Sequence, residues 1–194
     1  MSTERISAPR PTVEELDQEL KRRKHIKSCW SALWSTIWIL VVAAAVTVLF
    51  ATYFVSVLRI DGSSMNPTLE EGQYVVAVRS KKFKTGDVVA FYYNNQILLK
   101  RVIATSGEWV DIKEDGSVYV DEELLEEPYL EEKEYGDSDL SYPYQVPESR
   151  LFVMGDHRSS AADSRLSMIG TITADQIVGK VIFRVWPLTD LGII

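Results

Sequence analysis

Three features of this chain are suited to catalytic chemistry, and they lie far apart in the sequence. They are a serine, a lysine and a polar segment. Ser64 lies in residues 61–69, which also contain Gly62 and Pro67 and follow a long apolar run. A serine hydroxyl is a weak nucleophile unless an adjacent base accepts its proton. Glycine, serine and proline are also the usual residues of tight turns, so a catalytic role for Ser64 depends on residues elsewhere.

Lys100 is unusual because it lies inside the apolar segment 97–103. Burying an ammonium group is costly, and burial can lower the pKa of a lysine by several units. A neutral lysine amine is a competent general base, although a buried lysine can also be purely structural. Side chains alternate along a strand, so only one of Lys100 and Arg101 needs to face the core, and we expect Arg101 to point the other way.

The third polar segment, residues 153–165, follows directly on an apolar stretch. Alternating charges of this kind commonly fix a loop by hydrogen bonds. Two such pairs are possible, Asp156 with Arg158 and Asp163 with Arg165. The alternative is a triad of Ser64 with His157, for which Asp156 is the only evident orienting partner.

Seven short segments rich in β-branched and aromatic residues predict the strands that must position these groups. They are residues 74–78, 87–93, 97–99, 109–112, 117–120, 151–154 and 180–186. Glycine and asparagine residues separate them, as is typical of antiparallel hairpins. We therefore predict a mainly β fold, an antiparallel β-sheet domain over residues 58–194, with one helical turn at 173–177.

The run from Ser28 to Leu58 contains no charged residue and exceeds the roughly 20 apolar residues that cross a bilayer. A short helix from Thr12 through Lys27 and a basic cluster at 21–27 precede it. The run is too long and begins too far along the chain for a cleaved signal peptide. Basic residues favour the cytoplasmic side. We predict a single-pass protein of the cell membrane, with a cytoplasmic segment at 1–29, a transmembrane anchor at 30–57 and an extracytoplasmic domain at 58–194.

The charge distribution excludes some partners. Residues 1–33 carry seven Lys/Arg against five Asp/Glu, whereas residues 59–194 carry 14 against 23. An acidic outer part argues against binding nucleic acid.

Glutamates and prolines predict a loop-rich, solvated insertion at about 106–148, without the spacing of a calcium loop. Cys29, the only cysteine, can form neither an intrachain disulfide nor a Cys-based metal site, and we expect no metal.

Four segments, taken together, resemble a known family. They are residues 62–69, 85–91, 100–108 and 155–165, in this order and behind an N-terminal apolar run. The chain is similar over almost everything after residue 30 to type I signal peptidases, the membrane-bound Ser/Lys proteases that remove secretory signal peptides. The similarity is to the short, single-anchor form of Gram-positive bacteria. Any one segment alone would be weak evidence, because short motifs recur by chance.

The resemblance implies roles for particular residues and no cofactor. Ser64 would be the nucleophile, Lys100 the general base, and the backbone N–H of Ser64 an oxyanion donor. Some family members have a second donor, a serine side chain, at the position of Gly62. The residues that would support the site structurally are Asp156, Arg158, Asp163 and Arg165.

The resemblance also implies the substrate, which is an extended segment of a secretory preprotein at the surface of the lipid bilayer. Strand pairing would hold this peptide, and shallow apolar pockets would admit alanine at the residue before the cut and two residues earlier. The residues expected to bind it are Leu58, Ile60, Asp61, Met65, Leu69, Leu98 and Leu99. Residues 186–188 and 191–194 would either contact lipid or pack in the core.

Two positions depart from the family pattern. Ala161 replaces a serine whose hydroxyl usually holds the lysine ammonium, and His157 replaces an asparagine. Ser160 is adjacent to Ala161 and would need a small backbone shift to take over that contact. These changes motivate a second hypothesis, a catalytically impaired, membrane-anchored β domain that binds signal peptides or secreted partners.

Overall fold

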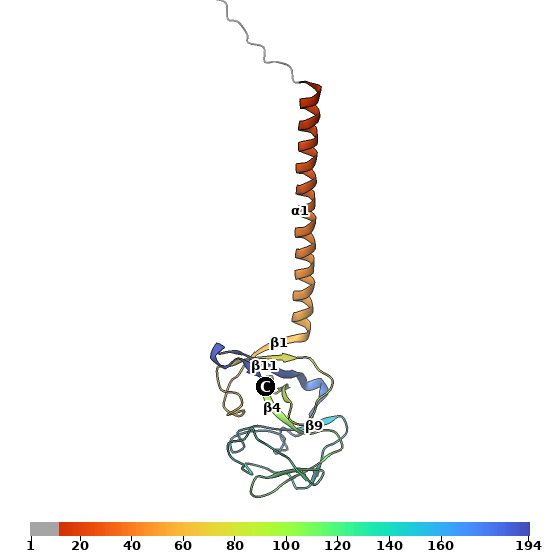
Figure 1. Cartoon of the computed structure of the whole chain (residues 1–194). Coiled ribbons are helices and arrows are strands. Elements are labelled where there is room, and N and C mark those ends of the chain that lie inside the picture. The colour runs from red at the N-terminus through yellow and green to blue at the C-terminus, as the bar shows by residue number, and fades with distance from the viewer. Residues whose placement is uncertain (1–11) are drawn as a thin grey trace, which may run out of the picture. The chain divides into compact units, whose positions relative to one another are not determined.

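The computed structural model describes residues 12–194, and its first element is one long helix, α1 (Val13–Phe54) (Figure 1). The helix continues past Lys27, where we expected a short helix to end. Its segment Ala32–Phe54 has a mean hydropathy of 2.4 and none of it is buried, so by length and composition it is a candidate membrane span. Residues 1–11, which begin the predicted N-terminal segment, lie outside the described residues, as does the side chain of Cys29.

Two threonine hydroxyls of the apolar helix bond to the helix backbone. The hydroxyl of Thr36 donates to the carbonyl of Ala32, and that of Thr47 donates to the carbonyl of Ala43. Bonds to the carbonyl four residues earlier give these two hydroxyls a partner in an apolar surrounding. A single apolar N-terminal helix of this kind is consistent with a membrane anchor.

The rest of the described chain is mainly antiparallel β-sheet, which confirms the predicted fold class. The strands are β1 (Val55–Arg59), β2 (Tyr74–Val78), β3 (Val88–Tyr93), β4 (Gln96–Ala104), β5 (Trp109–Ile112), β6 (Val118–Val120), β7 (Glu123–Leu124), β8 (Tyr144–Gln145), β9 (Arg150–Met154), β10 (Ile172–Thr173), β11 (Ile177–Trp186) and β12 (Gly192–Ile193). Short 3₁₀ helices occupy Ala174–Gln176, at the predicted helical turn, and Leu188–Asp190. Residues 55–57, which we had assigned to the anchor, begin β1.

The larger sheet has eight strands in the order β1-β2-β11-β3-β4-β9-β10, with β12 paired to β11. The late strand β11 lies between β2 and β3, so a segment near the end of the chain joins the first two strands to the rest of the sheet. In Figure 1, β11 (blue) runs beside the early strands. Strand β4 and strand β1, from which the loop with Ser64 extends, therefore belong to one sheet.

Strand β4 has a different neighbour along each half of its length. All of residues 96–101 pair with β3, with Val89 opposite Lys100. On its other side β4 pairs with β9 only from Arg101 onward, where Met154 is the partner. Residues 96–99 therefore have one edge without a strand partner among the described strands, and such an edge is available to an extended peptide.

The smaller sheet lies within the predicted acidic insertion and has the order β7-β6-β5-β8. Its apolar residues form a core of their own with the C-terminal half of β4. That core contains Ile103, Val110, Ile112, Val118, Phe152 and Met154. The insertion is therefore a small sheet with long loops, and it covers one face of β4.

This cover explains why one prediction was wrong. Arg101 does not point to solvent but is 7% exposed, while Lys100 is 2% exposed. Val102 packs against β3 and β9 residues, whereas Ile103 packs in the core of the smaller sheet. Because both faces of β4 are covered, alternation sends each of the two basic residues into the interior.

Candidate active site

Ser64 lies in a loop that is fixed at its base and along its length. The N–H of Ile60 donates to the carbonyl of Gln73 at 2.8 Å, which closes the loop just after β1. Met65 and Leu69 are buried, and the N–H of Leu69 donates to the carbonyl of Met65 at 2.9 Å. These apolar residues attach the loop to the core, while Ser64 itself remains half-buried.

Lys100 extends from β4 to this serine, and its Nζ lies 2.6 Å from Oγ of Ser64. Burial lowers the pKa of Lys100 to about 8, although the negative charge of Asp163 partly opposes the shift. Near this pH a large fraction of the amine is neutral, and a neutral amine at hydrogen-bond distance can accept the hydroxyl proton. The pair has the geometry of a nucleophile and its base.

The backbone of Ser64 offers a donor beside the hydroxyl. Among residues 12–194, no acceptor is bonded to the N–H of Ser64, whereas its carbonyl accepts from the N–H of His157 at 3.1 Å. Gly62 has a φ of +92°, a conformation that favours glycine, and it has no side chain that could add a second donor. The free N–H is available for a developing oxyanion.

The imidazole of His157 is not bonded to the nucleophile. It is exposed, and its Nδ1 lies 2.9 Å from Oγ of Ser160. Ser160 therefore does not take over the missing contact to Lys100, and Ala161 presents a buried methyl group. In the part of the chain that the structure describes, Oγ of Ser64 is the only hydrogen-bond partner of the Lys100 amine.

The expected pairing of Asp156 with Arg158 is wrong. Asp156 is paired with Arg101, through Nε to Oδ1 at 2.9 Å and Nη2 to Oδ2 at 2.6 Å. The hydroxyl of Thr68 also donates to Asp156, at 2.6 Å, and Nη1 of Arg101 donates to the carbonyl of Gly86 at 2.8 Å. This bidentate pair, with its bonds to Thr68 and Gly86, joins all four segments that resemble the family.

Arg158 pairs instead with Glu127, and both side chains are almost completely withdrawn from solvent. We expected the glutamates of the insertion to be solvated, and Glu127 is an exception at 6% exposure. The hydroxyl of Tyr129 donates to the same carboxylate at 3.0 Å. Burial raises the pKa of Tyr129, and the neighbouring charge of Glu127 raises it further.

Asp163 and Arg165 form the second expected pair, with 2.9 Å between Nη2 and Oδ2 and no exposed surface on either side chain. Asp163 also accepts the N–H of Gly155 at 3.0 Å. Arg165 donates to the carbonyls of Arg158 and Tyr135, at 2.8 and 2.6 Å. Each buried charge therefore has hydrogen-bond partners, which is what makes burial tolerable.

A shallow pocket of about 60 Å³ adjoins the nucleophile. Its lining residues are Arg59, Ile60, Asp61, Gly62, Ser64, Met65, Ile97, Leu98 and Leu99. Five of the seven predicted substrate-binding residues are among them, but Leu58 and Leu69 are not. Leu69 is fully buried in the same core cluster as Ile60 and Met65, so it cannot contact a peptide.

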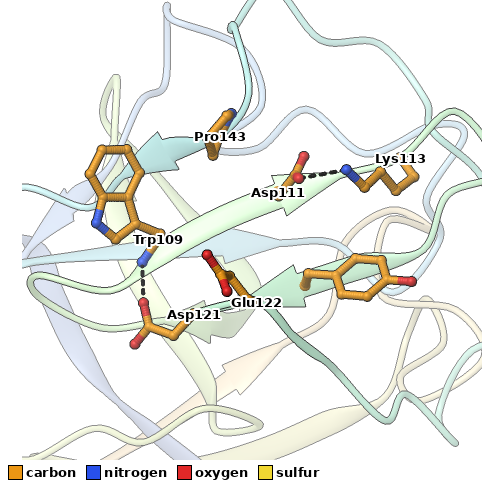
Figure 2. Close-up of a pocket in the computed structure, with 7 residues that line it drawn as sticks. Trp109, Asp111, Lys113, Asp121, Glu122 and Pro143 are labelled. Carbon is orange, nitrogen blue, oxygen red and sulfur yellow. Dashed lines mark hydrogen bonds and ion pairs between the residues drawn. The ribbon is translucent and has the colours of Figure 1, made fainter.

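A wider hollow of about 780 Å³ lies on the smaller sheet (Figure 2). Its polar groups are bonded locally, since Asp111 accepts from Lys113 at 2.7 Å and Asp121 accepts the N–H of Trp109 at 2.8 Å. Neither Ser64 nor any residue of β4 lines it. Among the described residues, no group of three or more histidine, cysteine or acidic side chains could hold a metal ion.

The chain is similar in sequence to known proteins. Residues 33–186 match the family described as signal peptidase, peptidase S26. The chain belongs to the signal peptidase family. Signal peptidase IB of Staphylococcus aureus (strain COL) is 37% identical over 177 residues, which are 79% of this chain and 90% of that protein. As a member of this family the protein is a serine endopeptidase that removes signal peptides.

Two further signal peptidase relatives differ in how much of each chain they share. Thylakoidal processing peptidase 1, chloroplastic, of Arabidopsis thaliana is 31% identical over 165 residues, which are 75% of this chain and 46% of that protein. A crystal structure of a signal peptidase I from Enterococcus faecalis V583 is 28% identical. It has a TM-score of 0.44 and covers 52% of this chain and 97% of its own.

Sequence reasoning missed three residues of this signal peptidase site. Thr68 bonds to Asp156, Glu127 to Arg158, and Tyr129 to Glu127. Thr68 lies in the matched nucleophile segment, so its position was a usable signal. Nothing in the sequence separates Glu127 from the exposed glutamates around it.

Proposed function

We propose that Ser64 and Lys100 form the catalytic dyad of this signal peptidase. The observation that carries the proposal is the 2.6 Å contact between Nζ and Oγ, made by a buried lysine whose pKa is lowered to about 8. Oγ bonds to the scissile carbonyl carbon as its proton moves to Nζ. The oxyanion is stabilised by the N–H of Ser64, and Lys100 returns the proton to the leaving amine. Water, activated by the same lysine, then hydrolyses the acyl-enzyme.

The substrate is a secretory preprotein bound as an added strand. Residues 96–99 of β4 have a free edge, and they face residues 59–62 across the small pocket beside Ser64. Main-chain pairing holds an extended peptide there irrespective of most side chains. A pocket of about 60 Å³ favours a small side chain such as alanine before the cut.

The helix anchors the enzyme in the cell membrane, with its N-terminus in the cytoplasm and the β domain outside. Basic residues 21–27 before the apolar span support this orientation. Four large apolar residues near the C-terminus are exposed and suited to contact lipid rather than to fill the core. They are Trp186, Leu188, Leu191 and Ile193.

Cleavage of a secretory precursor by the full-length protein in detergent tests the dyad. We expect Ser64→Ala and Lys100→Ala each to lower kcat/KM by about a thousandfold or more, since members of one catalytic unit fail together. Ser63→Ala, next to the nucleophile, and Lys81→Ala, both at exposed positions, serve as matched controls and should retain parental activity. If either dyad variant cleaves as fast as the parent, the assignment is wrong.

The same assay separates catalysis from binding alone. Lys100 has a single hydrogen-bond partner among the described residues, which keeps the impaired-enzyme hypothesis relevant. A stoichiometric precursor complex that yields no product over hours would support the second hypothesis, a catalytically impaired member of the family that binds signal peptides.

A further inference from the structure

Two side chains of the acidic insertion reach into the loop that follows β9. The carboxylate of Glu127 pairs with the guanidinium of Arg158, and both are buried, whereas the adjacent Glu126 is exposed. The remaining polar groups of the pair are also satisfied. Tyr129 donates its hydroxyl to Glu127 at 3.0 Å, and Nε of Arg158 donates to the carbonyl of Gly155 at 3.1 Å.

The ring of Tyr129 makes a second contact, to the other arginine of the site. Cζ of Arg101 lies 3.9 Å from the ring centroid, within the range of a cation–π interaction. Arg101 is the residue that holds Asp156 through two hydrogen bonds. Glu127 therefore contacts Arg158, which bonds to Gly155, and Tyr129 contacts Arg101, which bonds to Asp156. Through these two arginines they fix residues 155–158.

Residues 155–158 in turn lie directly against the dyad. A Cβ atom on Gly155 would be 2.5 Å from the carbonyl oxygen of Ser64 and 3.6 Å from Nζ of Lys100. The N–H of His157 donates to that same carbonyl at 3.1 Å. Since Ala161 presents only a methyl group nearby, packing against this loop, rather than a second hydrogen bond, sets the position of the amine.

We propose that Glu127 and Tyr129 are positioning residues, which hold the Ser64–Lys100 dyad in its reactive geometry through Arg158 and Arg101. The proposal rests on the dyad assignment made above. Neither residue lines the pocket beside Ser64, so they act on the chemical step and not on peptide binding. The acidic insertion thereby becomes part of the catalytic apparatus.

The proposal predicts how loss of the contact would be seen. Without the Glu127 charge, residues 155–158 relax away from Ser64 and water reaches the Lys100 amine. Since burial is the main cause that lowers the pKa of Lys100, hydration returns it toward its ordinary value. A larger share of the enzyme is then protonated at a given pH, and the acid limb of the activity profile moves upward.

The test compares Glu127→Gln with the matched control Glu126→Gln in the full-length protein. Precursor cleavage is followed from about pH 6 to about pH 10, to give kcat and KM separately. For Glu127→Gln we expect kcat to fall about tenfold or more, KM to stay within about twofold, and the acid limb to move up by at least about half a pH unit. Glu126→Gln should match the parent in all three.

A folded Glu127→Gln variant with the parental kcat and acid limb would overturn the proposal. So would a lower kcat that follows loss of folded protein, as measured by circular dichroism, with an unmoved limb, because that pattern means a structural role only. Glu127→Asp, which keeps the charge, should recover part of kcat. If Glu127→Gln does not fold, Tyr129→Phe, which removes one hydroxyl and no charge, replaces it in the test. Tyr129→Phe should lower kcat about threefold and move the acid limb to higher pH, and an unchanged pH profile contradicts the proposal.

Ser64→Ala and Lys100→Ala, measured in the same series, separate the two proposals. If either variant cleaves as fast as the parent, the dyad assignment fails and the positioning proposal fails with it. If both lose cleavage while Glu127→Gln and Tyr129→Phe equal the parent, only the positioning proposal fails.

Discussion

Nζ of Lys100 and Oγ of Ser64 lie 2.6 Å apart, although 36 residues separate them in the sequence. The lysine is fixed on a central strand, and the serine lies in a loop attached to the core by Met65 and Leu69. Both groups are thus held before substrate arrives, and this reduces the ordering needed to reach the transition state.

The acid limb of activity should report the ionisation of Lys100. Burial lowers its pKa to about 8, so the amine is mostly neutral above this pH and mostly protonated below it. We expect kcat/KM for a precursor to be half-maximal near pH 8 and to fall about tenfold per pH unit below it.

The control for this profile is His157→Asn, which removes the imidazole next to the site. The imidazole bonds to Ser160 and not to Ser64, so the variant should show the same limb as the parent. Activity that stays flat down to about pH 5 would exclude a lysine base.

Ala161→Ser should make the enzyme faster. The new hydroxyl would lie beside Gly155. A Cβ atom built on Gly155 would be 3.6 Å from Nζ of Lys100, so a hydroxyl near this point could accept a hydrogen bond from the amine. We expect kcat to rise several-fold, and the acid limb to shift upward, because an acceptor stabilises the charged form. Ala162→Ser, at the exposed neighbouring position, is the control and should change neither quantity. An unchanged kcat in Ala161→Ser would mean that this position does not limit turnover.

Lys100→Met should abolish cleavage but stabilise the fold. The parent must keep a charged lysine buried at neutral pH, and the pKa shift from 10.5 to about 8 puts the cost at about 3 kcal/mol. That cost is fully present below about pH 8 and disappears above about pH 10.5, since the folded-state pKa lies below the unfolded value. Urea unfolding at pH 7 should show a gain of about 1 to 3 kcal/mol. An equal or lower midpoint would show that burial of Lys100 carries no such cost.

Asp163→Ala should strongly destabilise the domain. It leaves Arg165, which has no exposed surface, without its carboxylate partner. Breaking a buried pair in this way costs about 3 to 5 kcal/mol. Asp137→Ala, at an exposed position in the same part of the chain, should have an effect within about 0.5 kcal/mol. Thermal unfolding of the two variants side by side measures the difference, and comparable midpoints would rule out a structural role for the pair.

The sequence predicted local features better than distant partners. The strand that contains Lys100 followed from a short apolar segment, whereas the role of Ser64 came from the ordered segments of a family and stays a prediction. The burial of Arg101 did not follow, because alternation along one strand cannot reveal that a second sheet covers the other face. The pairing of Asp156 with Arg101 was missed for a similar reason, since residues adjacent in sequence were the only partners that pattern alone could suggest.

The unpaired edge of β4 has a consequence for turnover. A precursor that pairs with residues 96–99 supplies the strand that this part of the sheet lacks. In the mechanism proposed above, cleavage at Ser64 divides this added strand, and each fragment keeps only part of its main-chain hydrogen bonds. The proposed binding mode therefore links product release to the reaction, because cleavage interrupts the segment that completes the sheet.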